Sequence, residues 1–312
     1  MTDQTLSNIT QNDSVEKQKP DKGFRLLLVT LLNLSISVVQ VIGGLLSNSL
    51  SLLSDALHNL GDAASLFISY LAKRISMNNP DLRKTFGYKR IEILAAFFNG
   101  MLLIAICIYL FFEAFKRIIK PESVDISIML PVAAFGFLIN LISMFLLLKR
   151  QKENINIRTA FLHLLSDSLS SVAVITGAIV MWLTGIYWVD AVISVAVGIY
   201  IIYQAWLVVK ETVDILMQST PLEIDINQVR RSIEDIDEIE NIHHVHVWRL
   251  NDSNIHFEAH IMLNRNLTMQ EMMICKNRVE KILGMQFRIS HITLQFEYGG
   301  CRDRELIVTD TR

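Results

Sequence analysis

Two pairs of ionisable residues stand inside largely uncharged, apolar stretches of this sequence. His58 and Asp62 are four residues apart, and so are His163 and Asp167, in the similar strings LHNLGD and LHLLSD. Residues four apart on a helix share one face, about 6 Å apart along the axis. Each pair would therefore present an imidazole and a carboxylate in one direction, and ionisable groups at membrane depth are functional candidates.

Two imidazoles and two carboxylates suit a tetrahedral divalent cation, with zinc the leading candidate. Two aspartates and one divalent cation sum to zero charge, whereas two ionised carboxylates alone are costly in a membrane. Protons are the natural replacement, so metal binding should release protons and metal release should recover them. A single intramembrane His or Asp often only hydrogen-bonds a neighbouring helix, but two copies with one spacing favour an exchange site.

Two further polar residues share the helix face of the first pair. Asp55 and Asn59 are expected to line an access path, and Asp55 could do so without touching metal. Asp190, at the start of the last apolar run, is interpreted as a cap of that helix at the membrane interface.

A second group of potential ligands lies near the C-terminal end. Five of the eight histidines fall within 18 residues: His243, His244, His246, His256 and His260. His291, Gln295 and Glu297 follow on one face of a later strand. A solvated polar face and a second metal site both remain open as interpretations of this pattern.

The composition indicates what kind of protein must position these residues. Of the 312 residues, 51% are hydrophobic and 19% charged, and the mean hydropathy of +0.37 is too apolar for an ordinary soluble protein. The formal net charge of −2 gives no indication of a nucleic-acid partner. Three dispersed cysteines without a CxxC pair exclude a disulfide framework and a zinc finger.

Uncharged runs of membrane-spanning length predict six transmembrane helices. The first two are expected at 24–46 and 50–73, and four more over 93–112, 126–148, about 159–184 and 191–209. The polar first 22 residues read as a tail rather than a signal peptide. Lys and Arg concentrate in that tail and in the loops after the second and fourth helices, which predicts that both termini are cytoplasmic.

Charges become frequent after Pro221 and indicate a separate small domain. A helix is expected over 225–236, strands over 243–250 and 255–263, a helix from the Thr268–Glu271 capping box to about 283, and a strand over 289–296. The fold class is therefore a polytopic α-helical membrane protein with a C-terminal cytoplasmic α+β ferredoxin-like (αββαβ) domain. The expected divisions are a tail over 1–23, a transmembrane domain over 24–213 and a cytoplasmic domain over 214–312.

With these motifs assembled, the chain resembles the cation diffusion facilitator family of zinc-type, proton-coupled metal transporters. The resemblance covers about residues 20–300 and is carried by SDALHNLGD at 54–62, TFGYKRIEILAAFFNG at 85–100, LHLLSD at 162–167, HHVHVW at 243–248 and HITLQFE at 291–297. It implies a homodimer that exports zinc from the cytoplasm and whose cytoplasmic domains dimerise and respond to metal.

Matched residue by residue, the resemblance places the transport site at His58, Asp62, His163 and Asp167. It places cytoplasmic-domain ligands at His243, His260, His291 and Glu297, with His244 and His246 as alternatives. Some relatives have a loop metal site after the second helix, but Asp81, Lys84 and Tyr88 leave at most one ligand there.

The resulting hypothesis is a secondary transporter that exchanges cytoplasmic Zn²⁺, with Cd²⁺ and Co²⁺ as further substrates, for protons. A bacterial inner membrane is expected, with the lipid bilayer, protons and a second copy of the chain as partners and no nucleic acid. One alternative is an intramembrane zinc metalloenzyme, although no HExxH motif occurs and four ligands would close the zinc shell. A metal sensor would not need buried ligands, and a manganese- or iron-selective member of the same family is a further alternative.

Overall fold

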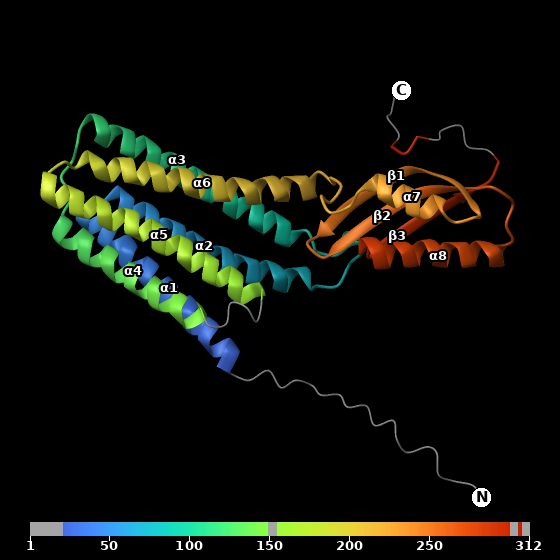
Figure 1. Cartoon of the computed structure of the whole chain (residues 1–312), viewed down its shortest axis with the longest axis horizontal. Coiled ribbons are helices and arrows are strands. Elements are labelled where there is room, and N and C mark those ends of the chain that lie inside the picture. The colour runs from blue at the N-terminus through green and yellow to red at the C-terminus, as the bar shows by residue number, and fades with distance from the viewer. Residues whose placement is uncertain (1–20, 149–154, 300–304, 308–312) are drawn as a thin grey trace, which may run out of the picture. The chain divides into compact units, whose positions relative to one another are not determined.

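The computed structural model describes residues 21–148, 155–299 and 305–307 and, within those ranges, forms eight helices and three strands. Six long helices come first (Figure 1): α1 (Asp21–Ser47), α2 (Leu50–Ser76), α3 (Ile91–Ile119), α4 (Ile126–Leu148), α5 (Ile155–Thr184) and α6 (Trp188–Leu216). The C-terminal elements are α7 (Ile226–Glu234), β1 (Ile239–Asn251), β2 (Asn254–Leu263), α8 (Met269–Phe287) and β3 (His291–Glu297). This order confirms the expected fold class. Most of the predicted N-terminal tail, and residues 149–154 of the loop after α4, lie outside the described residues.

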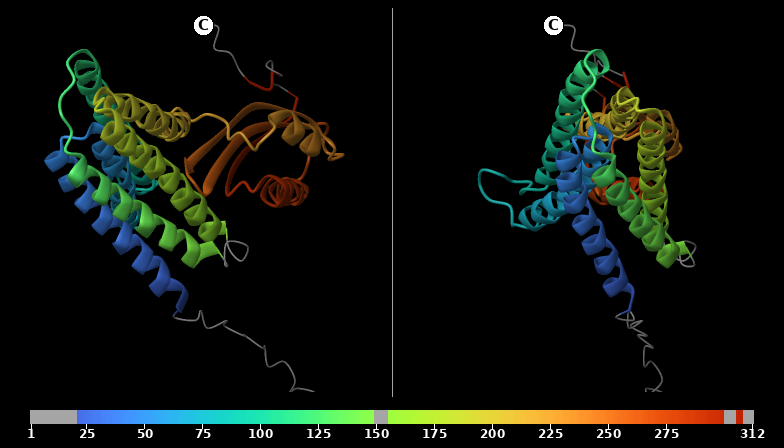
Figure 2. Two further views of the ribbon diagram at one scale, coloured as in Figure 1. Left: turned by 60° about the vertical axis from the view of Figure 1, so that its left-hand side comes forward. Right: turned by 90° about the vertical axis from the view of Figure 1, so that its left-hand side faces the viewer.

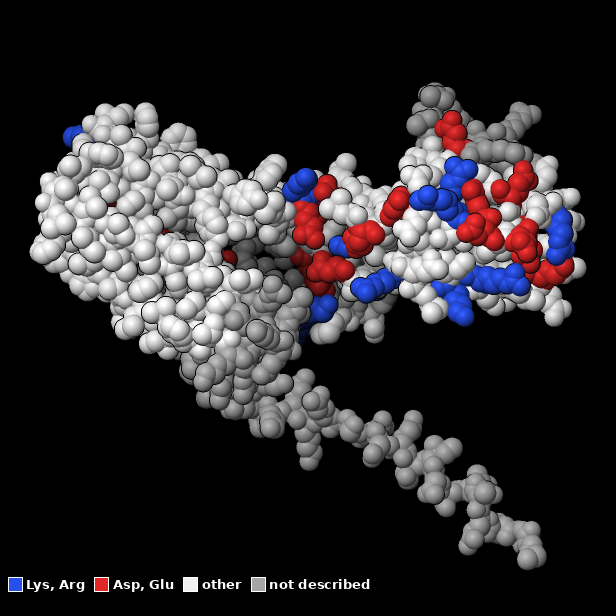
Figure 3. All heavy atoms as spheres, viewed as in Figure 1, with Lys and Arg blue, Asp and Glu red and all other residues white. Residues whose placement is uncertain are grey.

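The long helices have the apolar surface of membrane spans. Within the described residues, four helical stretches are long and apolar enough to cross a membrane: Ile91–Ile119, Ile126–Phe145, Phe161–Thr184 and Trp188–Leu216. In α2, the polar residues of the predicted metal site lower the mean hydropathy. Figure 3 shows few charged side chains over the helices on the visible face, whereas charges gather over the C-terminal domain. The protein is therefore a membrane protein.

The chain divides into two compact units, Met1–Ala63 with Glu122–Ile193, and Ala64–Pro121 with Ser194–Arg312. In the first unit α4 packs against both α1 and α5 (Figure 2). Its core contains Leu52, Met129, Val174 and Met181. At Gly136 of α4, an added Cβ would lie 2.5 Å from Nε2 of Gln40 on α1, so a larger residue there would displace the Gln40 side chain.

The start of α2 is fixed by a carboxylate from another helix. Asp190 of α6 accepts hydrogen bonds from the backbone N–H groups of Leu50 (2.6 Å) and Ser51 (3.2 Å) and from the Ser49 hydroxyl (2.7 Å). It therefore caps α2, not its own helix as the sequence had suggested. The first turn of α2 carries N–H groups that lack helical partners, and a carboxylate is well suited to accept from them.

The C-terminal domain, which lies in the second unit, has a three-stranded sheet in the order β1-β2-β3. β1 and β2 pair antiparallel, whereas β2 and β3 pair parallel. The strands share a core with α7 and α8 that includes Val229, Ile233, Phe257, Ile261 and Leu283. The expected capping box of Thr268 and Glu271 is present, and α8 continues to Phe287.

Candidate metal sites

The four predicted transport-site residues lie together in the first unit. His58 Nε2 is 3.7 Å from Asp62 Oδ2 and 3.7 Å from Asp167 Oδ1. His163 Nε2 is 3.3 Å from Asp62 Oδ2 and 3.5 Å from Asp167 Oδ2. Each imidazole from one helix thus faces a carboxylate from its own helix and one from the other. We call these four residues the quartet.

The spacing around the quartet suits a small divalent cation. Zinc bonds of 2.0–2.2 Å in a tetrahedron place neighbouring ligand atoms about 3.4 Å apart, close to the 3.3–3.7 Å observed. Opposite members of the ring are further apart, because no three of the ligand atoms lie within 4.8 Å of one another. Tetrahedral binding would therefore also require the two opposite pairs of ligand atoms to approach each other.

Asp167 is the member of the quartet whose environment most requires a cation. It is 1% exposed, and neither carboxylate oxygen has a hydrogen-bond partner in the described part of the chain. A buried carboxylate without a donor is costly unless a positive charge lies beside it. His58 is also buried, whereas the side chains of Asp62 and His163 are 32% and 42% exposed, so one side of the quartet is accessible.

Asp55 and Asn59 lie beside the quartet but are already engaged. Asp55 accepts hydrogen bonds from Gln40 of α1 and from Ser170 and Ser171 of α5, and Asn59 donates to Gln40. The roles of Gln40, Ser170 and Ser171 were not predicted from the sequence. Their only signal was that they are polar residues inside uncharged runs, a property shared by many serines of this chain.

A second group of ligand atoms comes together in the C-terminal sheet. One ligand atom each of His243, His260 and Glu297 lie within 4.8 Å of one another, the only such group among the described residues. Glu297 Oε1 is 2.9 Å from His260 Nδ1, and Oε2 is 3.5 Å from His243 Nε2. His243 Nδ1 lies 3.2 Å from the Asn241 side-chain oxygen, which leaves Nε2 directed at Glu297. Burial lowers the pKa of His243 and favours the neutral, metal-binding imidazole.

The other predicted C-terminal ligands are placed differently. The parallel register sets His291 opposite His256, whereas His260 is opposite Gln295, about 13 Å further along the strands. We call His243, His260 and Glu297 the trio. His291 does not join it but lies against His256, with ring centroids 4.6 Å apart. His244, at a bulge with φ 52°, stacks on His260 at 4.7 Å, and His246 lies beside His244.

The loop after α2 has no metal-ligand geometry at the residues the sequence singled out. Asp81 accepts from the backbone N–H groups of Arg83 and Lys84 and from the Tyr88 hydroxyl. The Lys84 ammonium lies 4.0 Å from the centre of the Tyr88 ring. Asp81 therefore serves the turn, and the pKa of its carboxyl is lowered by these backbone hydrogen bonds.

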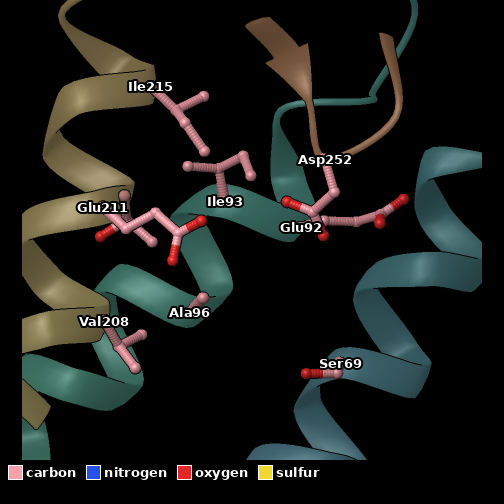
Figure 4. Close-up of a pocket in the computed structure, with 9 residues that line it drawn as sticks. Ser69, Glu92, Ile93, Ala96, Val208, Glu211, Ile215 and Asp252 are labelled. Carbon is pink, nitrogen blue, oxygen red and sulfur yellow. The ribbon is translucent and has the colours of Figure 1, made fainter. Parts of the chain in front are cut away.

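A cavity of about 300 Å³ in the second unit is also acidic (Figure 4). Glu92 of α3, Glu211 of α6 and Asp252 of the β1–β2 turn contribute to its lining. Glu92 pairs with Lys73 at 3.3 Å and accepts from Ser76. The cavity lining contains no histidine, so its ligand chemistry differs from that of the quartet.

Comparison with known sequence families covers the membrane part and the C-terminal domain. A family model described as the cation efflux transmembrane domain matches residues 26–217, and one described as the cation efflux protein, cytoplasmic domain, matches residues 221–298. The chain belongs to the cation efflux family, the cation diffusion facilitators. The resemblance inferred from the sequence motifs is therefore confirmed.

Individual relatives within the cation efflux family cover most of the chain. It is 39% identical over 301 residues to the zinc transporter ZitB of Yersinia pestis, covering 95% of this chain and 92% of the relative. It is 35% identical over 268 residues to the metal cation efflux system protein CzcD of Cupriavidus metallidurans (86% and 84% covered). It is 36% identical over 276 residues to the cadmium, cobalt and zinc/H(+)-K(+) antiporter of Bacillus subtilis (88% of each).

These relatives decide between the two classes of function considered from the sequence. All three are described as transporters, efflux proteins or antiporters. This cation efflux protein is accordingly a secondary transporter of metal cations rather than a metalloenzyme.

Proposed function

We propose that this cation efflux protein exports Zn²⁺ from the cytoplasm in exchange for protons, through the quartet. The observation that carries the proposal is the ring of two imidazoles and two carboxylates from α2 and α5 with neighbouring atoms 3.3–3.7 Å apart. His58 and His163 would complete the ligand shell, while Asp62 and Asp167 would bind the ion and take up protons in its absence.

The choice of ion follows from the donor set. Imidazole nitrogens with carboxylate oxygens suit Zn²⁺, and Cd²⁺ and Co²⁺ can use the same ligands. Manganese favours carboxylate, carbonyl and water oxygens, a harder set than this one. The printed names of the relatives, which include zinc, cadmium and cobalt, support the same choice over a manganese- or iron-selective transporter.

The charge balance of the quartet couples zinc movement to proton movement. With Zn²⁺ bound, the two aspartates and the ion sum to zero, so the loaded site can face either side of the membrane without a net buried charge. After release, the buried Asp167 favours a proton in place of the ion. Exposure of one site alternately to each side then links outward zinc movement to inward proton movement.

Several features belong to the proposal as a whole. Both termini lie in the cytoplasm of a bacterial cell, as the Lys and Arg distribution favours, and the six helices lie in the lipid bilayer of its inner membrane. The protein works as a homodimer, which the cytoplasmic-domain match supports. His243, His260 and Glu297 bind a regulatory zinc ion in that domain, and their spacing supports this role.

Zinc flux into proteoliposomes under an imposed pH gradient tests the proposal. The wild-type protein should move zinc with opposite proton movement, read by a zinc dye and a pH dye together. Asp62→Ala should abolish both signals, whereas Ser168→Ala, whose hydroxyl donates to the Leu164 carbonyl of its own helix, should keep them. Wild-type protein that binds zinc at the quartet but shows no flux under any gradient would exclude the transporter mechanism.

A further inference from the structure

The carboxylate of Asp55 is surrounded by donors from two other helices. Its Oδ2 accepts from Gln40 Nε2 of α1 at 3.1 Å and from the Ser171 hydroxyl of α5 at 3.2 Å, and its Oδ1 accepts from the Ser170 hydroxyl. Asp55 is 1% exposed. Three donors on two oxygens make it an interhelical junction rather than a free carboxylate directed at an ion.

Gln40 extends the junction by one more turn of α2. While its amide nitrogen donates to Asp55, its carbonyl oxygen accepts from Asn59 Nδ2 at 3.2 Å. One side chain of α1 thus bridges two successive turns of α2. Gly136 of α4 leaves room for Gln40, because a Cβ at that position would meet its Nε2 at 2.5 Å.

The junction lies where the geometry of the quartet is decided. The distances from His58 to Asp62 and from His163 to Asp167 are set within single helices by the i,i+4 spacing. The distances from His58 to Asp167 and from His163 to Asp62, 3.7 and 3.3 Å, depend instead on how α2 is rotated and shifted against α5. Asp55 is one turn from His58, and Ser170 and Ser171 are one turn from Asp167, so these hydrogen bonds fix that rotation.

We propose that Asp55 is a positioning residue that holds α2 against α1 and α5 so that the two HxxxD pairs meet at the separation zinc requires. This inference rests on the proposed function of the quartet. Asp55 acts through hydrogen bonds and neither binds the ion nor carries the exchanged proton. Its effect should therefore appear in the affinity for zinc.

Two substitutions separate this role from a role in metal or proton binding. Asp55→Ala removes the three hydrogen bonds that the Asp55 carboxylate accepts. Asp55→Asn removes the charge but keeps the bonds, because its oxygen can accept from Gln40 and its amide can donate to a serine hydroxyl. If Asp55 were a metal ligand or a proton carrier, both substitutions would impair transport. If it is a positioning residue, Asp55→Asn should keep the zinc affinity that Asp55→Ala loses.

The experiment measures the zinc dependence of the initial flux in proteoliposomes for wild type, Asp55→Ala, Asp55→Asn and the Ser170→Ala/Ser171→Ala double variant. We expect KM for zinc to rise about tenfold or more in Asp55→Ala and in the double serine variant, with a smaller change in kcat. Asp55→Asn should stay within about threefold of wild-type KM. Ser168→Ala, next to Asp167 but bonded within α5, should match wild type.

Each outcome has one reading. An Asp55→Asn variant as inactive as Asp55→Ala would overturn the proposal, because the negative charge would then be the essential feature. Wild-type KM in Asp55→Ala would overturn it as well. If Asp55→Ala does not fold, the double serine variant, which leaves the carboxylate in place, decides the question alone. A wild-type protein without flux would contradict the proposed function instead, so the two failures are distinguishable.

Discussion

At the scale of single residues, the proposed function assigns the choice of ion to the two histidines of the quartet. Replacing an imidazole with a carboxylate makes the donor set harder and favours Mn²⁺ over Zn²⁺. We expect His58→Asp to lower the ratio of zinc to manganese transport about tenfold or more, since ligand type contributes strongly to selectivity. The measurement is flux of each metal in proteoliposomes. The control His256→Asp changes a histidine outside the quartet, and an unchanged ratio in His58→Asp would contradict the assigned role.

The cytoplasmic trio makes a separate prediction at the same scale. In an Asp62→Ala background, zinc should still raise the thermal unfolding midpoint, because binding to the folded state alone stabilises it, by about 2.7 kcal/mol at one hundred times Kd. Adding Glu297→Ala should remove that rise, since Glu297 contacts both His243 and His260. Adding His291→Ala instead should leave it, because His291 lies beside His256. An equal loss of the zinc-dependent rise in both combinations would contradict zinc binding by the trio.

At the scale of elements, α2 depends on a cap supplied by α6. Asp190→Ala would leave the backbone N–H groups of Leu50 and Ser51 without their acceptor. We expect a loss of about 1–3 kcal/mol in the free energy of unfolding, measured as a lower unfolding midpoint of the detergent-solubilised protein. Ser168→Ala, which removes one hydroxyl of similar burial, should unfold as wild type does. An Asp190→Ala midpoint equal to wild type would show that water replaces the cap.

The start of α8 gives a pH-dependent prediction. Hydrogen bonds from the backbone and side chain of Thr268, and then from Arg265, lower the pKa of Glu271 from 4.5 to about 2. Because the folded pKa is the lower one, the stabilisation is complete above pH 4.5 and is lost as pH falls toward 2. Hydrogen exchange of α8, corrected for intrinsic rates, should follow this loss in wild type and not in Glu271→Gln. The same pH profile in both proteins would contradict the prediction.

The elements also indicate how far the sequence alone could lead. Hydropathy and the capping box predicted the helices and the αββαβ order, because these depend on local pattern. The i,i+4 spacing predicted that His58 pairs with Asp62 and His163 with Asp167, since that spacing is a property of a single helix. The junction at Asp55 and the cap from Asp190 were not predicted, because each partner comes from a distant helix and serine or glutamine in an apolar run has no distinctive pattern. The separation of His291 from His243 and His260 was not predicted, because the register of β3 is set by pairing with β2 and not by its own sequence.

At the scale of the whole molecule, the protein combines a membrane part with few charged residues and a charged C-terminal domain, each with its own candidate metal group. The quartet comes from two helices of the first unit, and the trio comes from one sheet of the second. Their donor sets differ: two carboxylates neutralise a divalent ion in the quartet, whereas the trio has one. A neutral loaded site suits an ion that must cross the membrane, and a site that keeps a positive charge suits an ion bound in a domain outside the membrane.

Proton coupling is the central claim, and it is tested most directly by imposing a zinc gradient alone. Proteoliposomes with equal pH on both sides receive external zinc, and internal pH is recorded with time. The account predicts that zinc uptake moves protons outward, so that the lumen becomes more alkaline, and that Asp62→Ala and Asp167→Ala show neither movement. Zinc uptake by the wild type at constant internal pH, in well-sealed vesicles, would contradict it.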